Sequence, residues 1–210
     1  MATKRPAAKK TASAKKAAPA KKAGTRRAPA KATVTAESAR SLGRAATYTV
    51  PGLSEKDGSR TAEILQSRLV SLIDLSLTLK HVHWNVVGVG FIGVHEMLDP
   101  QYQAVSLMVD ATAERIATLG ESPNGLAGEL VRQRGWDDYA LGRDVVVAHL
   151  KALDSAYVGV VSSHREAVEE LGDLDPVSED LLIGQLGQLE MFQWFIRAHL
   201  ESPDGYIATR

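Results

Sequence analysis

The chain has 210 residues, 44% of them hydrophobic, which is enough for one well-filled domain plus an appendage. It contains no cysteine, so disulfides and thiolate metal sites are excluded and only nitrogen and oxygen ligands remain. Because the sequence has neither a signal-peptide core nor an apolar run of about eighteen residues, we expect a cytoplasmic protein without a membrane span.

The formal net charge of zero conceals two opposed segments. Residues 1–44 carry thirteen Lys and Arg against one acid, a net charge of +12, and residues 45–210 carry the balance of −12. The first segment consists largely of Ala, Lys, Pro, Thr and Ser, and it has too little apolar surface to fold. We therefore predict a disordered basic tail over residues 1–44 and a folded domain over residues 45–210.

The basic residues of the tail recur as doublets every five or six positions. Lysine-rich segments of this kind bind phosphate backbones without sequence preference, by releasing counterions. No aromatic residue is interleaved, so stacking on single-stranded bases is not expected. A second interpretation is a solvated tail that only keeps the protein soluble. The candidate DNA contacts are Lys4, Arg5, Lys9, Lys10, Lys15, Lys16, Lys21, Lys22, Arg26, Arg27 and Lys31.

The rest of the chain has the apolar spacing of four long helices, with no strand pattern of substance. Pro100 is expected to kink the second helix and Gly120 to end it. Asp144 is predicted to cap the third helix, and Asp175-Pro176 to begin the fourth. The expected segments are a linker over residues 45–58, helices over 59–83, 93–119, 145–171 and 176–202, and a connection over 121–143 with a short helix at 127–133. Such a long connection between the second and third helices is typical of an all-α, ferritin-like four-helix bundle.

One stripe of the second helix concentrates metal-ligating side chains. At roughly 100° per residue, four of them share a stripe about a hundred degrees wide: His95, Asp99, Asp110 and Glu114. Asp99 and Asp110 lie eleven residues apart, roughly 16 Å along the axis, which is too far for one metal site. Two chains laid antiparallel about a twofold axis near Ala104 would bring the two ends together. The spacing therefore predicts a dimer with two equivalent sites.

A further ligand is expected from the end of the first helix, where His81 and His83 are equal candidates from the sequence alone. Glu96 is turned about 100° away from His95, so it is not expected in the same site. Imidazole and carboxylate without sulfur suit iron, although zinc or manganese would also fit. The remaining histidines are interpreted as core or surface residues: His149, His164 and His199.

The same stretch resembles the Dps family, ferritin-like proteins that protect DNA in starved bacterial cells. The family's motif stands here as His83-Trp84-Asn85, Gly88, Phe91, His95-Glu96-Met97-Leu98-Asp99 and Asp110-Ala111-Thr112-Ala113-Glu114-Arg115. The similarity extends over roughly residues 46–202. By this resemblance the histidine of the first helix that binds metal is His83, and the ferroxidase ligands are His83, His95, Asp99, Asp110 and Glu114.

The resemblance implies oxidation of Fe(II) to Fe(III), preferentially by hydrogen peroxide, and storage of ferric mineral in a hollow dodecamer. Two irons would bind at each intersubunit site, the second of them more weakly and with help from Asp110. The resemblance also implies a nucleoid-associated protein that binds DNA nonspecifically through its tail. An alternative from a different class is a nucleoid-structural, DNA-compacting protein whose metal site is vestigial.

The acidic segment over residues 173–180 joins the third and fourth helices and allows two interpretations. It is either a solvated loop whose carboxylates are favoured by the helix dipole, or the lining of a threefold pore that draws Fe(II) inward. The candidate pore residues are Asp175, Glu179 and Asp180, of which Asp180 is the closest match to a pore-lining carboxylate of the family.

Overall fold

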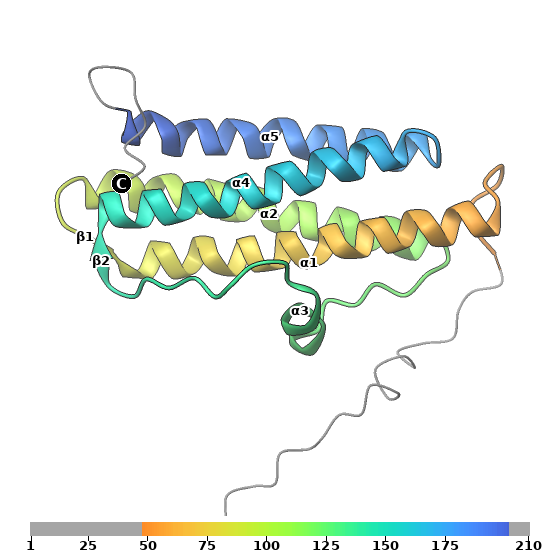
Figure 1. Cartoon of the computed structure of the whole chain (residues 1–210), viewed down its shortest axis with the longest axis horizontal. Helices are drawn as coiled ribbons and strands as arrows, with labels where there is room; N and C mark the ends of the chain where they lie inside the picture. Colours follow the sequence, from red (N-terminus) through yellow and green to blue (C-terminus); the bar gives the residue numbers. More distant parts are fainter. Residues whose placement is uncertain (1–47, 202–210) are drawn as a thin grey trace, which may run out of the picture.

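The structure, a computed structural model, describes residues 48–201, so the predicted tail lies outside the described residues. Four long helices lie side by side (Figure 1): α1 (Glu55–Asn85), α2 (Phe91–Thr118), α4 (Val146–Leu171) and α5 (Pro176–Leu200). The short α3 (Ala127–Gln133) lies in the long connection that follows α2 and runs past α1. The predicted all-α, ferritin-like bundle with its long crossover is confirmed, and none of the helices within residues 48–201 is long and apolar enough to span a membrane.

The first helix begins one turn before the predicted start, because the chain supplies a cap there. The Ser54 hydroxyl accepts a hydrogen bond from the Asp57 backbone N–H (3.1 Å) and donates one to the Asp57 carboxylate (2.7 Å). Gly58 is buried in this turn, where a Cβ atom would lie only 2.6 Å from the Thr49 hydroxyl. The predicted linker over residues 45–58 was therefore wrong in its last four residues, which belong to α1.

The second helix continues through Pro100 without a break. The missing proline N–H leaves the carbonyl of Glu96 without its helical donor, but both residues are exposed, so water reaches that group. The helix ends as predicted at Gly120, which has a φ of +90°. The N–H groups of Gly120 and Glu121 donate back into the last turn at 3.0 and 3.2 Å, the arrangement of a Schellman motif.

The crossover is attached to the bundle at its middle and at its end. Directly after α3, Arg134 makes a two-pronged ion pair with the buried carboxylate of Asp74 (2.8 and 2.9 Å). The end of the crossover forms a two-residue strand, β2 (Asp144–Val145), which pairs in parallel with β1 (Val86–Val87) directly after α1. The predicted cap at Asp144 was wrong, because Asp144 is in β2 and its side chain accepts a hydrogen bond from the neighbouring Val145 N–H (2.7 Å). The predicted cap at Asp175 is confirmed.

The core consists of two apolar clusters at successive levels of the bundle. The larger includes Leu79, Leu98, Leu153 and Ile196, and the smaller includes Leu65, Ile116, Leu171 and Leu182. Truncating one of these leucines to alanine typically costs ~2–5 kcal/mol of folding free energy. Between the two clusters lies a layer of buried polar side chains from three helices: Thr112, His164 and Gln185.

Candidate metal centre

His83, in the last turn of α1, faces His95, in the second turn of α2. Their rings stack with centroids 3.7 Å apart and planes 21° apart. The His83 Nδ1 lies 3.0 Å from the His95 carbonyl oxygen, and the His95 Nδ1 lies 3.0 Å from the His83 carbonyl oxygen. Since a carbonyl only accepts hydrogen bonds, both rings carry their proton on Nδ1 and keep the Nε2 lone pair free. Metal-binding histidines are held in this way, by a hydrogen bond from the ring nitrogen that does not bind the metal.

His81, the alternative considered from the sequence, is directed elsewhere. Its Nε2 lies 2.7 Å from the Leu141 carbonyl oxygen, and its ring meets the Tyr139 ring edge-on at 5.6 Å. His81 therefore ties α1 to the crossover, and it is His83 that the fold brings to His95.

Asp99, one turn after His95, lies at the same end of α2 and belongs to the same group. Its Oδ1 is 3.5 Å from the His83 Nδ1 and accepts a hydrogen bond of 2.6 Å from the Lys80 ammonium. Lys80, which is the main cause, lowers the pKa of Asp99 below its ordinary value. Sequence reasoning missed Lys80, although its place three residues before His83 puts it on the same side of α1.

Asp110 and Glu114 lie at the other end of the stripe, roughly 16 Å further along α2. Both are exposed, and neither carboxylate has a hydrogen bond or ion pair to another described residue. Over the range 48–201, one chain forms no cluster of three or more His, Asp or Glu side chains that could hold a metal ion. A single chain thus supplies two separate groups of ligand-type residues.

Asp175, one of the three candidate pore residues, is buried and already paired. Its Oδ2 lies 2.5 Å from Arg115 and 2.5 Å from the Ser178 hydroxyl, and Arg115 also donates to that hydroxyl at 2.9 Å. Burial opposes ionisation, but the hydrogen bonds from Ser178 and Arg115 outweigh it, so the pKa of Asp175 lies below its ordinary value. Of the other two candidates, Glu179 is half-buried and Asp180 is exposed.

Trp84, beside His83 in the motif, is 72% exposed and makes no ring contact within the described part of the chain. The basic residues of the tail, from Lys4 to Lys31, lie outside the described residues. The site that the structure describes therefore consists of the His83, His95 and Asp99 group and the distant carboxylates of Asp110 and Glu114.

Comparisons with known proteins identify the fold and the family of the chain. A family model described as a ferritin-like domain matches residues 62–204. The DNA protection during starvation protein of Mycolicibacterium smegmatis is 58% identical over 160 residues, which cover 76% of this chain and 87% of that protein. The solved structure of Mycobacterium smegmatis Dps in its tetragonal form has a TM-score of 0.77 and 57% identity and covers 78% of this chain and 99% of the other. DpsA14 from Streptomyces coelicolor also has a TM-score of 0.77 and 57% identity, and the match covers 79% of this chain and 98% of the other.

The fold and the matched family model define a ferritin-like protein. Within that class, the chain belongs to the Dps family, as the predicted resemblance indicated. This family is known for iron storage and ferroxidase activity, and its members are multimers.

Proposed function

We propose that this chain is a Dps-type ferroxidase and iron-storage protein. In this proposal it oxidises Fe(II) with hydrogen peroxide, stores the ferric mineral in a hollow dodecamer and binds DNA through its basic tail. The single observation that carries the ferroxidase part is the pair of histidines, His83 and His95, whose Nδ1 atoms are both engaged and whose Nε2 atoms are both free.

Each site would form between two chains, since one chain separates its ligand-type residues by roughly 16 Å. His83, His95 and Asp99 of one chain would meet Glu114 and Asp110 of the partner subunit across an antiparallel pair of α2 helices. Asp110 and Glu114 are like charges one turn apart, an arrangement that costs stability unless a cation compensates it. Two Fe(II) ions, the substrate, would supply that positive charge at each site.

The proposed reaction balances with two irons and one peroxide. Each Fe(II) gives up one electron, the O–O bond of hydrogen peroxide breaks, and its two oxygen atoms leave as hydroxide or, after protonation, as water. The protein's contribution is to hold two imidazoles and three carboxylates in one place, a ligand set without sulfur that suits iron. Iron and peroxide are then consumed together, which keeps both from damaging DNA.

The direct test is Fe(II) oxidation by stoichiometric peroxide, comparing the wild type with His95→Ala/Asp99→Ala and sizing both particles. We expect fast oxidation in the wild type and a loss of at least about 100-fold in a mutant particle of unchanged size. Equal and slow oxidation in both proteins would favour the alternative function, a nucleoid-structural protein with a vestigial metal site.

DNA binding is proposed from the charge of the tail, +12 over residues 1–44. A dodecamer would carry twelve tails, so weak phosphate contacts would add up to strong attachment by multivalency. Such attachment would place the protein in the cytoplasm with the nucleoid. We expect deletion of residues 1–44 to abolish a gel shift of linear DNA, and the full-length shift to weaken steeply with salt. A shift that survives the deletion would assign DNA binding to the folded domain.

Fe(II) uptake through a pore near the start of α5 is proposed for Asp180, which is exposed there. A carboxylate in such a pore raises the local concentration of cations. Asp180→Asn should slow the rate of iron uptake while leaving assembly intact. Asp173→Asn is the matched control, because Asp173 is another exposed carboxylate of the same acidic segment. Equal uptake rates in the wild type and Asp180→Asn would refute the pore assignment.

A further inference from the structure

A cleft of about 290 Å³ lies between the second half of the crossover and the surface of α4. Its floor is formed by the small residues Ala152, Ala156 and Gly159, which share one face of α4. A Cβ atom at Gly159 would lie 3.9 Å from the Trp136 ring, so the ring rests against the helix there. The small residues leave the space that larger side chains on this face would fill.

The walls of the cleft are aromatic and are held in place by the fold. Trp136 and Tyr139 both pack against the larger core cluster. The Tyr139 hydroxyl also lies 3.0 Å from the Nδ1 of the buried His149, and it donates to the His149 carbonyl oxygen at 3.2 Å. The cleft is therefore formed before any ligand binds, as ligand pockets usually are.

Both charged residues of the lining are acids. Asp138 is exposed and pairs with Arg134, whose other terminal nitrogen binds Asp74. Asp137 is exposed and has no hydrogen bond or ion pair to another described residue. The two carboxylates repel a phosphate or any other anion and attract a cation. The charge of the lining therefore favours a cationic ligand.

An aromatic wall beside an unpaired carboxylate suits an organic cation with an apolar stem. The face of a Trp ring attracts ammonium and guanidinium groups, and the stem of a Lys or Arg side chain covers apolar surface. Thr78 and Ser155 add hydroxyl oxygens, which accept hydrogen bonds from such a group. The volume lies at the lower limit of small-molecule sites, so the cleft has room for one long side chain.

The basic tail of this chain is the ligand that charge and reach favour. Residues 1–44 carry a net charge of +12, and the rest of the chain carries −12. The described residues begin at Tyr48, shortly before α1, and Thr78 lies roughly 35 Å along α1 from the start of that helix. Lys31 precedes Tyr48 by seventeen residues, a stretch that spans up to roughly 56 Å when extended. Lys31 and the basic residues before it can therefore reach the cleft.

We propose that the cleft between the crossover and α4 binds a Lys or Arg side chain from residues 21–31 of the tail, of the same or a neighbouring copy of the chain. These residues are favoured because the entropy cost of closing a loop grows with its length. The cation lies against the Trp136 ring near Asp137, and its apolar stem lies along Ala152 and Ala156. DNA has to displace a docked tail, a consequence that rests on the proposed DNA binding, whereas the docking itself does not.

Fluorescence quenching in the full-length, iron-free protein tests the docking. Because the sequence contains no cysteine, Ala23→Cys and Ala28→Cys each accept a single bimane label, which tryptophan quenches only at short range. We expect quenching of at least one label at low salt and its loss at about 1 M salt, where the Debye length is ~3 Å. Trp136→Phe should abolish the quenching, and the control Trp194→Phe, which removes another exposed tryptophan, should keep it. No quenching of either label, or quenching that survives Trp136→Phe, would overturn the proposal.

Asp137→Asn tests the charge of the cleft while Trp136 stays in place. Since Asp137 has no partner among residues 48–201, this variant should keep the particle size and lose most of the quenching. Asp173→Asn is the matched control, because it removes the same charge at an exposed position outside the cleft, and it should be quenched like the wild type. Equal, strong quenching in both variants would overturn the recognition of a cation by Asp137.

Adding linear DNA to the labelled proteins separates this proposal from the proposed DNA binding. We expect DNA to relieve the quenching, because phosphates compete with the cleft for the same basic side chains. If the protein does not bind DNA at all, the proposed function fails while the quenching by Trp136 still supports the docking. If DNA binds through the tail and the quenching stays unchanged, the proposed competition is wrong.

Discussion

The two ends of α2 differ in how far a single chain prepares them for metal binding. At the first end, the His83 and His95 rings are fixed by reciprocal hydrogen bonds of 3.0 Å, and Asp99 is held by Lys80. At the other end, Asp110 and Glu114 are exposed and form no contact with other described side chains. The first end is ordered by its own chain, whereas the second would be ordered only by a partner or a ligand.

This difference follows from the side chains near the end of α1, which contact the first end of α2. The end of α1 carries His83 in its last turn and Lys80 one turn earlier, and both side chains reach the first end of α2 in the same chain. The carboxylates of Asp110 and Glu114 face away from the rest of their own subunit. Substituting the ligand-type side chains at either end tests whether the two ends form one site. Substituting the residues that pair with nearby carboxylates tests how each end is supported.

The largest expected effect comes from mixing two inactive variants. His95→Ala/Asp99→Ala lacks the first end and Asp110→Asn/Glu114→Gln lacks the second, so each alone should lose at least about 100-fold of its Fe(II) oxidation rate. If the two ends meet across a twofold axis, each mixed dimer contains one intact site. Co-assembled particles should then recover about a quarter of the wild-type rate. No recovery in co-assembled particles of normal size would contradict the intersubunit site.

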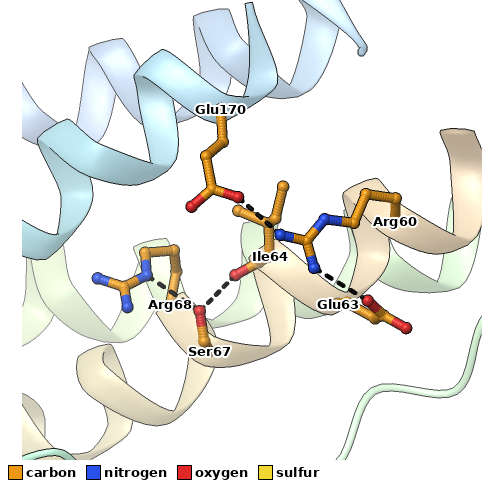
Figure 2. Close-up of polar contacts among 6 residues, drawn as sticks. All are labelled: Arg60, Glu63, Ile64, Ser67, Arg68 and Glu170. Carbon is orange, nitrogen blue, oxygen red and sulfur yellow. Dashed lines mark hydrogen bonds and ion pairs between the residues drawn. The ribbon is translucent and has the colours of Figure 1, made fainter.

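A smaller but still large effect is expected for Arg115→Met, next to Glu114. It leaves the buried Asp175 carboxylate without its cation, which should cost about 3 kcal/mol in the free energy of unfolding at neutral pH. Urea unfolding followed by circular dichroism measures this loss. The matched control is Arg60→Met, since Arg60 bridges Glu63 and Glu170 at an exposed position (Figure 2), where solvent screens the ion pairs, and its loss should shift the unfolding curve much less.

The Arg115–Asp175 pair also predicts a pH dependence. Because the pKa of Asp175 is lowered in the folded chain, the pair stabilises the fold above about pH 4, where the unfolded carboxyl is ionised. That stabilisation is lost as the pH falls further, through the folded-state pKa. In Arg115→Met, burial still disfavours the ionised form of the Asp175 carboxylate, but the cation that helped to outweigh burial is gone. The difference from the wild type should therefore be full at neutral pH and shrink on acidification, and a constant difference would argue against an ionic contribution.

A modest effect is expected at Lys80, whose ammonium occupies the Asp99 carboxylate at 2.6 Å. An incoming Fe(II) ion has to displace it. Because Asp99 is partly exposed, solvent screens the pair, so Lys80→Met should tighten Fe(II) binding only modestly, by up to about fivefold. Anaerobic titration calorimetry measures this affinity, with Lys56→Met, at an exposed position of α1, as control. Weaker binding in Lys80→Met would mean that Lys80 supports the site instead of competing for it.

The smallest effect is expected at Glu96, which adjoins His95 but is turned about 100° around α2. Glu96→Gln should leave the Fe(II) oxidation rate within about twofold of the wild type. A large loss of rate would mean that Glu96 reaches the iron from another subunit, and the ligand set would then need to be extended.

Much of this protein could be predicted from the sequence, because helices are encoded locally. Apolar spacing predicted all four long helices, and the short helix at residues 127–133 has its predicted bounds. Gly120 and Asp175-Pro176 marked their helix ends correctly, since each carries its own capping chemistry. The spacing of His95, Asp99, Asp110 and Glu114 likewise indicated two groups separated along one helix.

Other features were decided by tertiary contacts that no local pattern encodes. The start of α4 depends on the pairing of β2 with β1, a strand that lies far away in the sequence, so the cap predicted at Asp144 failed. His81 and His83 have similar sequence surroundings, and only packing directs one to the crossover and the other to His95. Lys80 meets its partner, Asp99, only because α1 packs against α2. The sequence by itself determined the helices and the ligand types, whereas the packing of the helices determined which side chains meet.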